Sequence, residues 1–281
     1  MTAYVGTAGW NIPRAHRDRF AADGSQLQRY ASRLNAVEIN TSFYRPHTAA
    51  IYQRWAAAVP ASFRFSVKIP KLITHARALT APREPLTRFL GEIAGLGDTL
   101  GPLLVQLPPS LAFDPRVASR FFGLLRRLHD LPVVCEPRHA TWTTPDAERL
   151  LLAHRIARVA ADPPRAAGFE APGGWPGIVY YRWHGSPRPY FSPYAPLAID
   201  RLHDAIAPLG VDVWCIFDNT GSGAAAGNAL DLAGRLTRPD SPGPRAGARA
   251  PSETASRSRA PDPRAPRSAD RPPPVPPRAT R

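Results

Sequence analysis

The strongest constraint on the fold of this chain is a regular alternation of short apolar segments with longer amphipathic ones. Apolar segments of β-strand type lie at residues 3–6, 36–40, 64–69, 103–107, 133–136, 157–161, 178–183 and 211–217. Stretches with helical periodicity lie between or after them, at 26–34, 49–58, 86–93, 116–128, 145–154, 196–206 and 224–236. Such alternation predicts parallel strands joined by crossover helices. Eight such strands favour a closed (β/α)8 TIM-type barrel over an open sheet.

The alternation is interrupted once, between residues 162 and 177. This segment reads DPPRAAGFEAPGGWPG, and its proline and glycine content rules out a regular helix. We therefore expect a loop in place of the sixth helix of the barrel.

A domain boundary is expected near Leu236. Residues 238–281 contain ten arginines, four acidic residues and no aromatic residue. Such a segment buries too little apolar surface to offset the entropy of ordering. The sequence thus predicts one folded domain at residues 1–237 and a disordered Pro/Arg-rich tail at 238–281. The basic charge of the tail leaves two interpretations open, an inert extension and an electrostatic tether for a polyanion such as RNA.

Composition narrows the class of protein further. No run of about 18 apolar residues is present, so no membrane association through a spanning helix is expected. The N-terminus lacks a basic segment followed by an apolar one, which argues against secretion. Two cysteines, Cys135 and Cys215, are too few for a disulfide framework, so we expect a cytoplasmic protein. The net charge of +14 leaves nucleic-acid binding open without favouring it, because a general bias toward Arg, Ala and Pro produces the same charge. Nothing in the sequence indicates the oligomeric state.

Polar side chains share one face near the C-terminal ends of five predicted strands. Alternate residues of a strand face opposite sides, so one set points toward the helices and the other toward the barrel axis. The inward set comprises Glu38, Asn40, Ser66, Lys68, Gln106, Glu136, Arg138, Arg182 and His184. Barrel enzymes build their active sites at this end of the strands. The pattern therefore predicts a polar pocket there.

The same segments resemble a known family. The motifs VGTAGW, VEINTSFYRP, FRFSVKIPKLITH, LGPLLVQLPPSLAF, VCEPRHATW, YYRWHG and WCIFDNT follow one another along the chain. Together they resemble the YecE-like family, also called "domain of unknown function 72", over residues 4–236. The resemblance implies a TIM-barrel-like fold and leaves the activity open, as the name of the family concedes. The chain departs from the commonest pattern at Pro137, Ala140, Thr141 and Asp218, and residues 238–281 lie outside it.

Four inward residues are the candidates for catalysis. Glu38 and Glu136 come from strands on opposite sides of the barrel, and paired carboxylates in different environments can divide acid and base roles. The alternative is that each neutralises an interior base such as Lys68, Arg138 or Arg182. Lys68 itself is a candidate nucleophile, although ion pairing is the favoured interpretation. His184, at the end of the seventh strand, completes the set.

A second group of residues is expected to bind the substrate: Asn40, Tyr44, His75, Gln106, Arg138, Asp162, Arg182 and Asn219. We expect no cofactor. A divalent-metal site built from His75, His139 and His184 with Glu136, Asp162 and Asp218 stays open as an alternative, although no compact ligand motif such as HExxH is present.

These observations lead to one functional hypothesis and two alternatives. The leading hypothesis is an enzyme that acts by acid/base chemistry on a small polar or anionic substrate, such as a carbohydrate-like compound. The alternatives are a non-catalytic ligand-binding or nucleic-acid-binding barrel and a divalent-metal-dependent hydrolase or isomerase. Because Lys68, Arg138 and Arg182 face only two carboxylates of comparable depth, we expect the pocket to hold spare positive charge and to bind an anion. Asp162 and Asp218 would cancel that excess if they also pointed inward.

Overall fold

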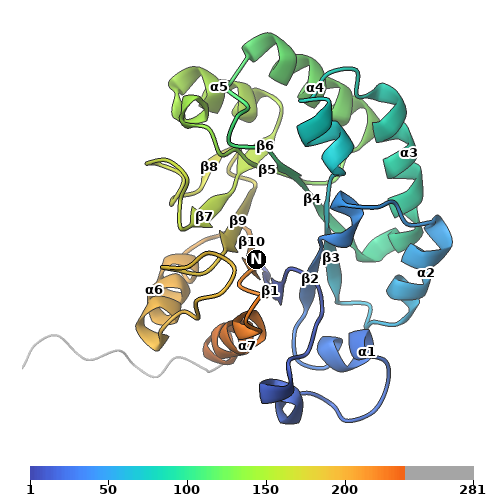
Figure 1. Ribbon diagram of the computed structural model, residues 1–281, viewed down its shortest axis with the longest axis vertical. Coiled ribbons are helices and arrows are strands. Elements are labelled where there is room, and N and C mark those ends of the chain that lie inside the picture. The colour runs from blue at the N-terminus through green and yellow to red at the C-terminus, as the bar shows by residue number, and fades with distance from the viewer. Residues whose placement is uncertain (238–281) are drawn as a thin grey trace, which may run out of the picture. The chain divides into compact units, whose positions relative to one another are not determined.

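The computed structural model of the protein describes residues 1–237. Parallel strands occupy its middle and helices surround them (Figure 1). The strands are β1 (Ala3–Thr7), β2 (Ala36–Ile39), β3 (Arg64–Lys68), β4 (Leu100–Gln106), β5 (Val133–Glu136), β6 (Ile156–Arg158), β7 (Ala160–Asp162), β8 (Gly173–Gly174), β9 (Ile178–Trp183) and β10 (Asp212–Phe217). The longer helices are α1 (Gln26–Ala31), α2 (Ala49–Ala57), α3 (Arg83–Ile93), α4 (Pro115–Leu128), α5 (Pro145–Ala153), α6 (Pro196–Ile206) and α7 (Ala224–Leu236). The predicted strand–helix alternation is confirmed.

The strands form two hydrogen-bonded sheets. One has the order β1-β10-β9-β7 and the other β2-β3-β4-β5-β6-β8. All strand pairs are parallel except β6 with β8. The sheets are therefore those of a mixed α/β fold with crossover connections.

The sixth predicted strand is split into β6 and β7. Val159 separates the two pieces and donates its amide hydrogen to the carbonyl of Cys135 at 2.8 Å. β6 pairs with β5, whereas β7 pairs with β9, so this short segment touches both sheets. Among the described residues no helix lies between β7 and β9, where the sequence predicts a loop.

The two sheets also approach each other between β1 and β2. Ala8 forms an isolated parallel bridge with Glu38, and the Gly9 amide donates to the Glu38 carbonyl at 2.9 Å. Gly6 is required at this approach, because a Cβ atom added there would lie 2.0 Å from the Ala36 carbonyl oxygen.

Capping residues fix the starts of several helices. Ser25 and Gln28 form a reciprocal capping box at α1, which satisfies two amide groups that the helix itself leaves free. Asp114 caps α4 and Thr144 caps α5 through their side chains. A proline follows each of these two caps at the first helical position, where its fixed φ angle suits the helix.

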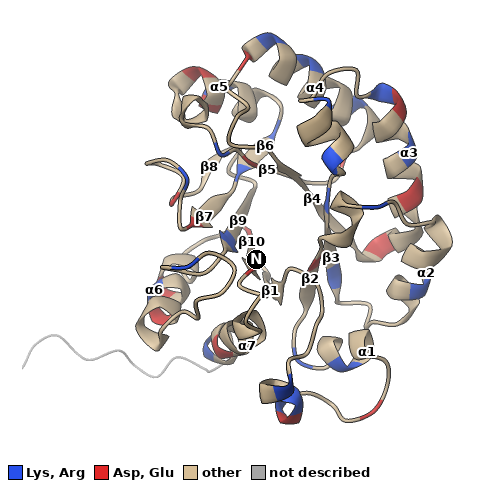
Figure 2. Cartoon of the chain, in the orientation of Figure 1, with Lys and Arg blue, Asp and Glu red and all other residues tan. Residues whose placement is uncertain are grey.

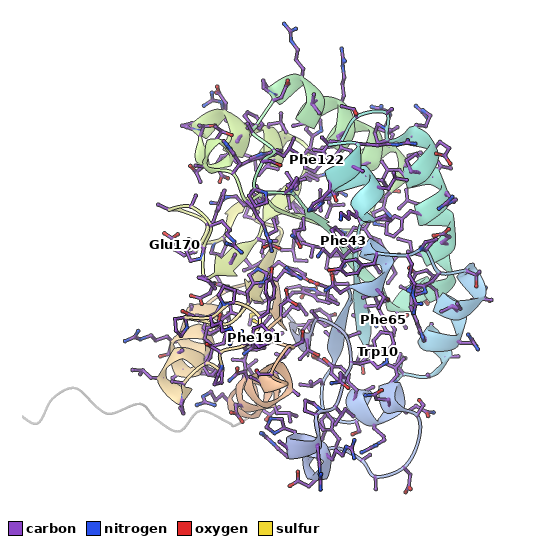
Figure 3. The ribbon with its side chains drawn as sticks, in the orientation of Figure 1. Trp10, Phe43, Phe65, Phe122, Glu170 and Phe191 are labelled. Atoms are coloured by element: carbon purple, nitrogen blue, oxygen red, sulfur yellow. The ribbon has the colours of Figure 1, made fainter. Side chains whose placement is uncertain are left out.

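Strand parity divides the buried apolar residues into two clusters. The larger one packs strands against helices and includes Phe65 and Phe122 (Figure 3). The smaller one lies on the opposite face of the strands and contains Ala36, Leu104, Val134, Ala157, Val159, Ile178, Tyr180, Trp214 and Ile216. The predicted inward polar residues continue this second face toward the C-terminal ends of the strands. The inner face is thus apolar at one end and polar at the other.

Helices α3, α5, α6 and α7 carry charged residues of both signs, whereas the charged residues of α4 are all arginines (Figure 2). No helix within the described part of the chain is long and apolar enough to cross a membrane. Cys135 and Cys215 are both buried and free. The predicted tail, residues 238–281, lies outside the described residues, and its boundary at residue 237 stays a prediction.

Candidate functional site

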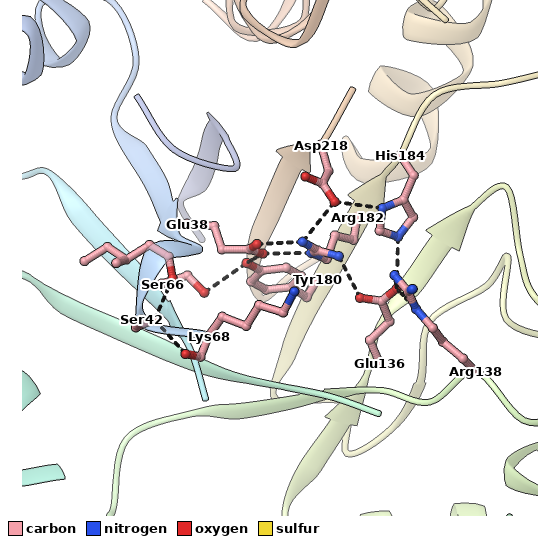
Figure 4. A network of polar contacts seen from close by, with 11 residues as sticks. Glu38, Ser42, Ser66, Lys68, Glu136, Arg138, Tyr180, Arg182, His184 and Asp218 are labelled. Carbon is pink, nitrogen blue, oxygen red and sulfur yellow. Dashed lines mark hydrogen bonds and ion pairs between the residues drawn. The ribbon is translucent and has the colours of Figure 1, made fainter. Parts of the chain in front are cut away.

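Arg182 stands at the centre of a buried polar network at the C-terminal ends of the strands (Figure 4). Its side chain on β9 is fully buried. Nε and Nη2 donate to the two carboxylate oxygens of Glu38 at 2.8 and 2.7 Å. Nη1 donates to Glu136 at 2.9 Å, and Nη2 lies 3.1 Å from Asp218. One guanidinium therefore joins carboxylates from β2, from β5 and from the residue after β10, in the forked geometry that arginine prefers.

Glu38 is fixed by more than the guanidinium. The Tyr180 hydroxyl lies 3.0 Å from Glu38 Oε2 and 2.9 Å from Ser66 Oγ, so the phenol donates to the carboxylate. Glu38, Tyr180 and Ser66 are all fully buried. The contacts of this carboxylate agree with the alternative role predicted for it, neutralising an interior base.

His184 connects the two remaining carboxylates. Its Nε2 lies 2.9 Å from Glu136 Oε1 and its Nδ1 lies 3.0 Å from Asp218 Oδ2. Arg138 also donates to Glu136 Oε1, through Nε at 3.2 Å and Nη2 at 3.1 Å. Glu136 thus accepts from three basic side chains and, like Glu38, serves as an anchor in this geometry.

The electrostatic consequences follow from burial and pairing. Burial alone would raise the pKa of Glu136, but Arg138, Arg182 and His184 together hold that pKa well below its usual value. The pKa of Asp218 is lowered in the same way, since Arg182 and His184 overcome the effect of burial. Burial alone would lower the pKa of His184, yet its two carboxylate partners raise it. A protonated His184 between two ionised carboxylates is the state that this geometry favours.

The presence of Asp218 in the network corrects one prediction. Three carboxylates, not two, face the cations Lys68, Arg138 and Arg182, because Asp218 points inward at the end of β10. The cations are therefore balanced in number by the carboxylates, and a protonated His184 adds one further positive charge.

Lys68 is the cation that the carboxylates do not contact. Within residues 1–237 no carboxylate lies at ion-pair distance from its ammonium group, which instead sits 4.0 Å from the centroid of the Phe43 ring. The side chain is only 4% exposed. Burial and the positive charge of Arg182 lower its pKa from 10.5 to about 8, against the attraction of the nearby carboxylates. The favoured interpretation of Lys68 as an ion-pairing residue was wrong.

His75 shares this electropositive environment. Its ring packs edge-on against Phe43, with the centroids 5.0 Å apart, and its Nδ1 lies 2.9 Å from the Thr74 hydroxyl. Burial, followed by the charges of Lys68 and Arg138, lowers its pKa from 6.5 to about 4. At neutral pH His75 is an uncharged imidazole beside a buried ammonium group.

The other predicted binding residues divide into two sets. Gln106 is buried and pairs in register with Glu136, and Asn40 carries a buried Oδ1 without a hydrogen-bond partner among the described residues. Tyr44 is 74% exposed and lies outside the network. Gln106 therefore lies beside the network, whereas Tyr44 is exposed to solvent away from it.

Asp162 and Asn219 have structural contacts instead. Asp162 accepts a hydrogen bond from the Tyr194 hydroxyl at 2.7 Å. Asn219 donates to the Ser192 carbonyl at 3.0 Å and to Asn228 at 2.9 Å. Both side chains therefore hold the segment after β9 in place. The Asp162 backbone carbonyl also accepts a hydrogen bond from the amide of His184, a network residue, at 2.6 Å.

The residues proposed as a divalent-metal site do not fit one. Both ring nitrogens of His184 are occupied by Glu136 and Asp218, and the Arg182 guanidinium fills the space between those carboxylates. His139 is turned toward Thr141, with Nδ1 2.9 Å from its hydroxyl. Within the described part of the chain, no group of His, Cys, Asp and Glu has a metal-binding arrangement.

Two residues of the network, Tyr180 and Ser66, were not predicted as site residues. Both carry a parity signal that could have identified them: Tyr180 shares the inward face with Arg182, and Ser66 with Lys68. A third residue, Tyr190, lies at the rim, with its ring centroid 5.7 Å from that of His184. Its φ of 70° is unusual for a residue with a side chain.

Fold and site together define a class, an α/β protein of parallel strands with a charge-dense buried network at their C-terminal ends. The chain belongs to the family described as "Protein of unknown function DUF72", whose model matches residues 4–252. Contrary to the expectation that the pattern ends at residue 236, the match extends into the predicted tail.

Individual relatives agree with this assignment. The chain is 32% identical over 125 residues to the UPF0759 protein YecE of Escherichia coli K12. The aligned part spans 44% of each protein, less than half the length of that curated relative. Crystal structures of two DUF72 family proteins superpose on most of the chain. The Enterococcus faecalis protein has a TM-score of 0.71 at 23% identity and covers 85% of this chain and 97% of its own. The Thermotoga maritima protein has a TM-score of 0.69 at 24% identity, with coverages of 85% and 100%. These two structures show a shared fold.

Proposed function

We propose that this protein is an enzyme that binds a small anionic substrate and transfers a proton with Lys68. The observation that carries the proposal is the buried Lys68 ammonium at the end of β3, which has no carboxylate partner within residues 1–237 and has a pKa of about 8. Strained or unpaired charges of this kind gather at functional sites because stability alone does not favour them.

The surroundings of Lys68 support an anionic ligand. Arg138 is nearly buried, and its charge, like that of Lys68, contributes to the lowered pKa of His75. Lys68 has no carboxylate partner in the described part of the chain, so an incoming phosphate or carboxylate would supply the missing negative charge. Charge-assisted hydrogen bonds to such a group are stronger than neutral ones.

The pKa of Lys68 supports proton transfer. With a pKa of about 8, roughly a tenth of the molecules carry a neutral amine at pH 7, and a general base works best when its pKa lies near the operating pH. The carboxylates of Glu38, Glu136 and Asp218 do not carry this step; they and Arg182 hold the surrounding groups rigid. His75, neutral at pH 7, is placed to accept or donate a hydrogen bond to the bound ligand.

The proposal includes a closed arrangement of the strands. The Ala8–Glu38 bridge joins β1 to β2, and the split strand β6–β7 pairs on both sides. These contacts support a continuous (β/α)8 barrel, in which every strand end borders one central pocket.

The chain is well suited to a direct test, because Lys68 and Lys71 are its only lysines. Reductive methylation with 13C-formaldehyde labels these two side chains and the N-terminus, and their NMR shifts can be followed against pH. We expect the Lys68 signal to titrate near pH 8 and to move to higher pH when inorganic phosphate binds, while exposed Lys71 serves as the internal reference. A Lys68 signal that titrates at its ordinary value of about 10.4 contradicts the proposal.

Catalysis is tested separately from binding. A panel of small keto acids, hydroxy acids and sugar phosphates in D2O reports proton transfer through the loss of a C–H signal in NMR. Lys68→Arg keeps the charge but cannot lose its proton near neutral pH, so it should retain anion binding and lose exchange. Lys71→Arg is the matched control. Equal exchange rates in the wild type and in Lys68→Arg would leave a non-catalytic binding protein as the better description.

A further inference from the structure

A cavity lies beside the network, at the C-terminal ends of β1 and β2. Its volume is about 310 Å3, within the range of small-molecule sites. Ala8 and Gly9 form part of its wall, and both contact Glu38 through the backbone. The remaining wall carries Trp10, Asn11, Gln26 and Tyr44. Among residues 1–237, no charged side chain lines this cavity.

One short turn connects this cavity to Lys68. The turn Thr41–Phe43 follows β2 directly, and its flanking residues Asn40 and Tyr44 line the cavity together with Thr41. Phe43, within the same turn, packs against the Lys68 ammonium instead. The Ser42 hydroxyl donates to the Lys68 carbonyl at 2.7 Å and ties the turn to β3. The same short turn thus contributes to the wall of the cavity and contacts the Lys68 ammonium group.

The polar groups of the cavity are the amides of Asn11, Gln26 and Asn40 and the hydroxyls of Thr41 and Tyr44. Asn40 Oδ1 is buried and has no partner among the described residues, which is costly unless a ligand supplies a donor. Gln26 donates to Asn11 at 3.1 Å, and within residues 1–237 that contact leaves the Asn11 amide hydrogens and the Gln26 carbonyl oxygen unpaired. Donors and acceptors are therefore interspersed around the wall.

The wall also provides aromatic surface. Trp10 is held by an edge contact with Trp55, with ring centroids 5.0 Å apart. Tyr44 is 74% exposed, unusual for a large ring without a contact partner on its outer side. Rigid aromatic faces with a few convergent amides are the usual lining of small-ligand sites.

From this juxtaposition we infer that the cavity holds the hydroxylated ring of a sugar whose phosphate or carboxylate group is bound at Lys68. Neutral amides pair with hydroxyl groups as both donors and acceptors, and the apolar face of the ring stacks on Trp10 or Tyr44. The inference rests on the proposed function, since it uses Lys68 as the anion site, and it adds the substrate class: an anionic sugar.

The test compares probes that share an anion and differ in the ring. Calorimetric titrations use D-glucose 6-phosphate, D-glucuronate, inorganic phosphate, acetate, adenosine 5′-monophosphate and neutral D-glucose. We expect the sugar phosphate or the sugar acid to bind at least roughly tenfold more tightly than its ring-less counterpart. Comparison of the sugar phosphate with the sugar acid shows whether the anion site prefers a phosphate or a carboxylate.

Variants separate the two parts of the site. Tyr44→Ala and Asn40→Ala should remove the tenfold advantage of the sugar probe and leave inorganic phosphate binding unchanged, whereas Lys68→Met should weaken both. Leu197→Ala, an exposed apolar position on α6, is the control. Circular dichroism melting confirms that each variant is folded, and NMR chemical-shift mapping of the wild type locates the sugar independently of the variants.

The outcomes distinguish the inference from the function it rests on. Equal affinity for the sugar phosphate and inorganic phosphate, with Tyr44→Ala unaffected, overturns the sugar site and leaves the anion site standing. Binding of D-glucose to the cavity without any anion binding overturns the proposed function and keeps the sugar site. Tighter binding of adenosine 5′-monophosphate than of either sugar probe overturns the choice of a sugar. Failure of every probe overturns both proposals.

Discussion

Replacement of Arg182 by methionine offers the sharpest physical test of the buried network. Methionine fills a similar volume but removes the guanidinium that contacts Glu38, Glu136 and Asp218. These carboxylates are nearly or fully buried, so at neutral pH the variant leaves negative charge without its main partner. Breaking one buried ion pair costs about 3–5 kcal/mol, against a total stability of about 5–15 kcal/mol for a domain. We expect a loss in the upper part of that first range.

The pH dependence of the stability of Arg182→Met is a second, independent test of the network. In the wild type the pKa values of Glu136 and Asp218 are lowered, so their stabilising contribution is present above the unfolded pKa of about 4 and is lost as pH falls through the lower folded value. Without Arg182, burial becomes the larger influence on Asp218 and raises its pKa. The carboxyl then takes up a proton on folding, so the stability deficit of the variant should shrink from pH 8 toward pH 5.

Urea unfolding followed by tryptophan fluorescence at pH 8 and pH 5 measures both effects. Arg19→Met is the control, because Arg19 pairs with Asp231 at 3.1 Å on the surface, where the side chains are 37% and 47% exposed; its loss should be about 0–1 kcal/mol. Adding Glu38→Gln to Arg182→Met removes one unpaired charge and should restore stability. If Arg182→Met costs no more than Arg19→Met, or if the second substitution lowers stability further, the network does not depend on the guanidinium as described.

Three further predictions follow from the described residues. Lys68→Met should raise the pKa of His75 from about 4 toward 6.5, since one of the charges that lowers it is removed; histidine ring NMR measures this, and an unchanged value contradicts the electropositive pocket. Gly6→Ala should lower the melting temperature sharply, because the added Cβ would lie 2.0 Å from the Ala36 carbonyl oxygen of the neighbouring strand. Gly91→Ala has open space in α3 and should stabilise the protein by about 0.5–1 kcal/mol. Equal effects of the two substitutions on stability would refute the close approach at Gly6. A chain ending at residue 237 should keep the melting temperature of the full chain, and a collapse on truncation refutes the predicted domain boundary.

The alternation of apolar segments was sufficient to predict the elements and their faces. β5 and β9 have the predicted bounds, and strand parity alone placed Glu38, Glu136, Arg182 and His184 on one side. This succeeded because the two-residue period of a strand and the burial of its apolar face are local properties. Tyr180 and Ser66 followed the same rule and could have been found by extending it to every inward position.

The pairing of the charges could not be predicted in the same way. The sequence favoured an ion pair for Lys68, but in the structure no carboxylate among the described residues contacts it. The sequence left Asp218 at an uncertain strand end, but in the structure its side chain pairs with Arg182. Asp218 reaches Arg182 because β9 and β10 run side by side in register, with Arg182 opposite Ile216. Lys68 stays apart because the turn after β2 places the Phe43 ring beside its ammonium group. Such contacts depend on neighbouring strands and on loop conformation to within about 1 Å, a precision beyond any sequence period.

The sequence by itself therefore determined the type of fold, the family and the set of inward polar residues, since each depends on patterns that repeat along the chain. The tertiary structure decided which of those residues serve as anchors and which retains an unsatisfied charge. Glu38, Glu136 and Arg182 neutralise one another because they converge from three strands, and that convergence leaves Lys68 as the buried cation without a carboxylate partner among the described residues. Electrostatic energy depends on distance and burial in three dimensions, so it is settled only where distant segments of the chain meet.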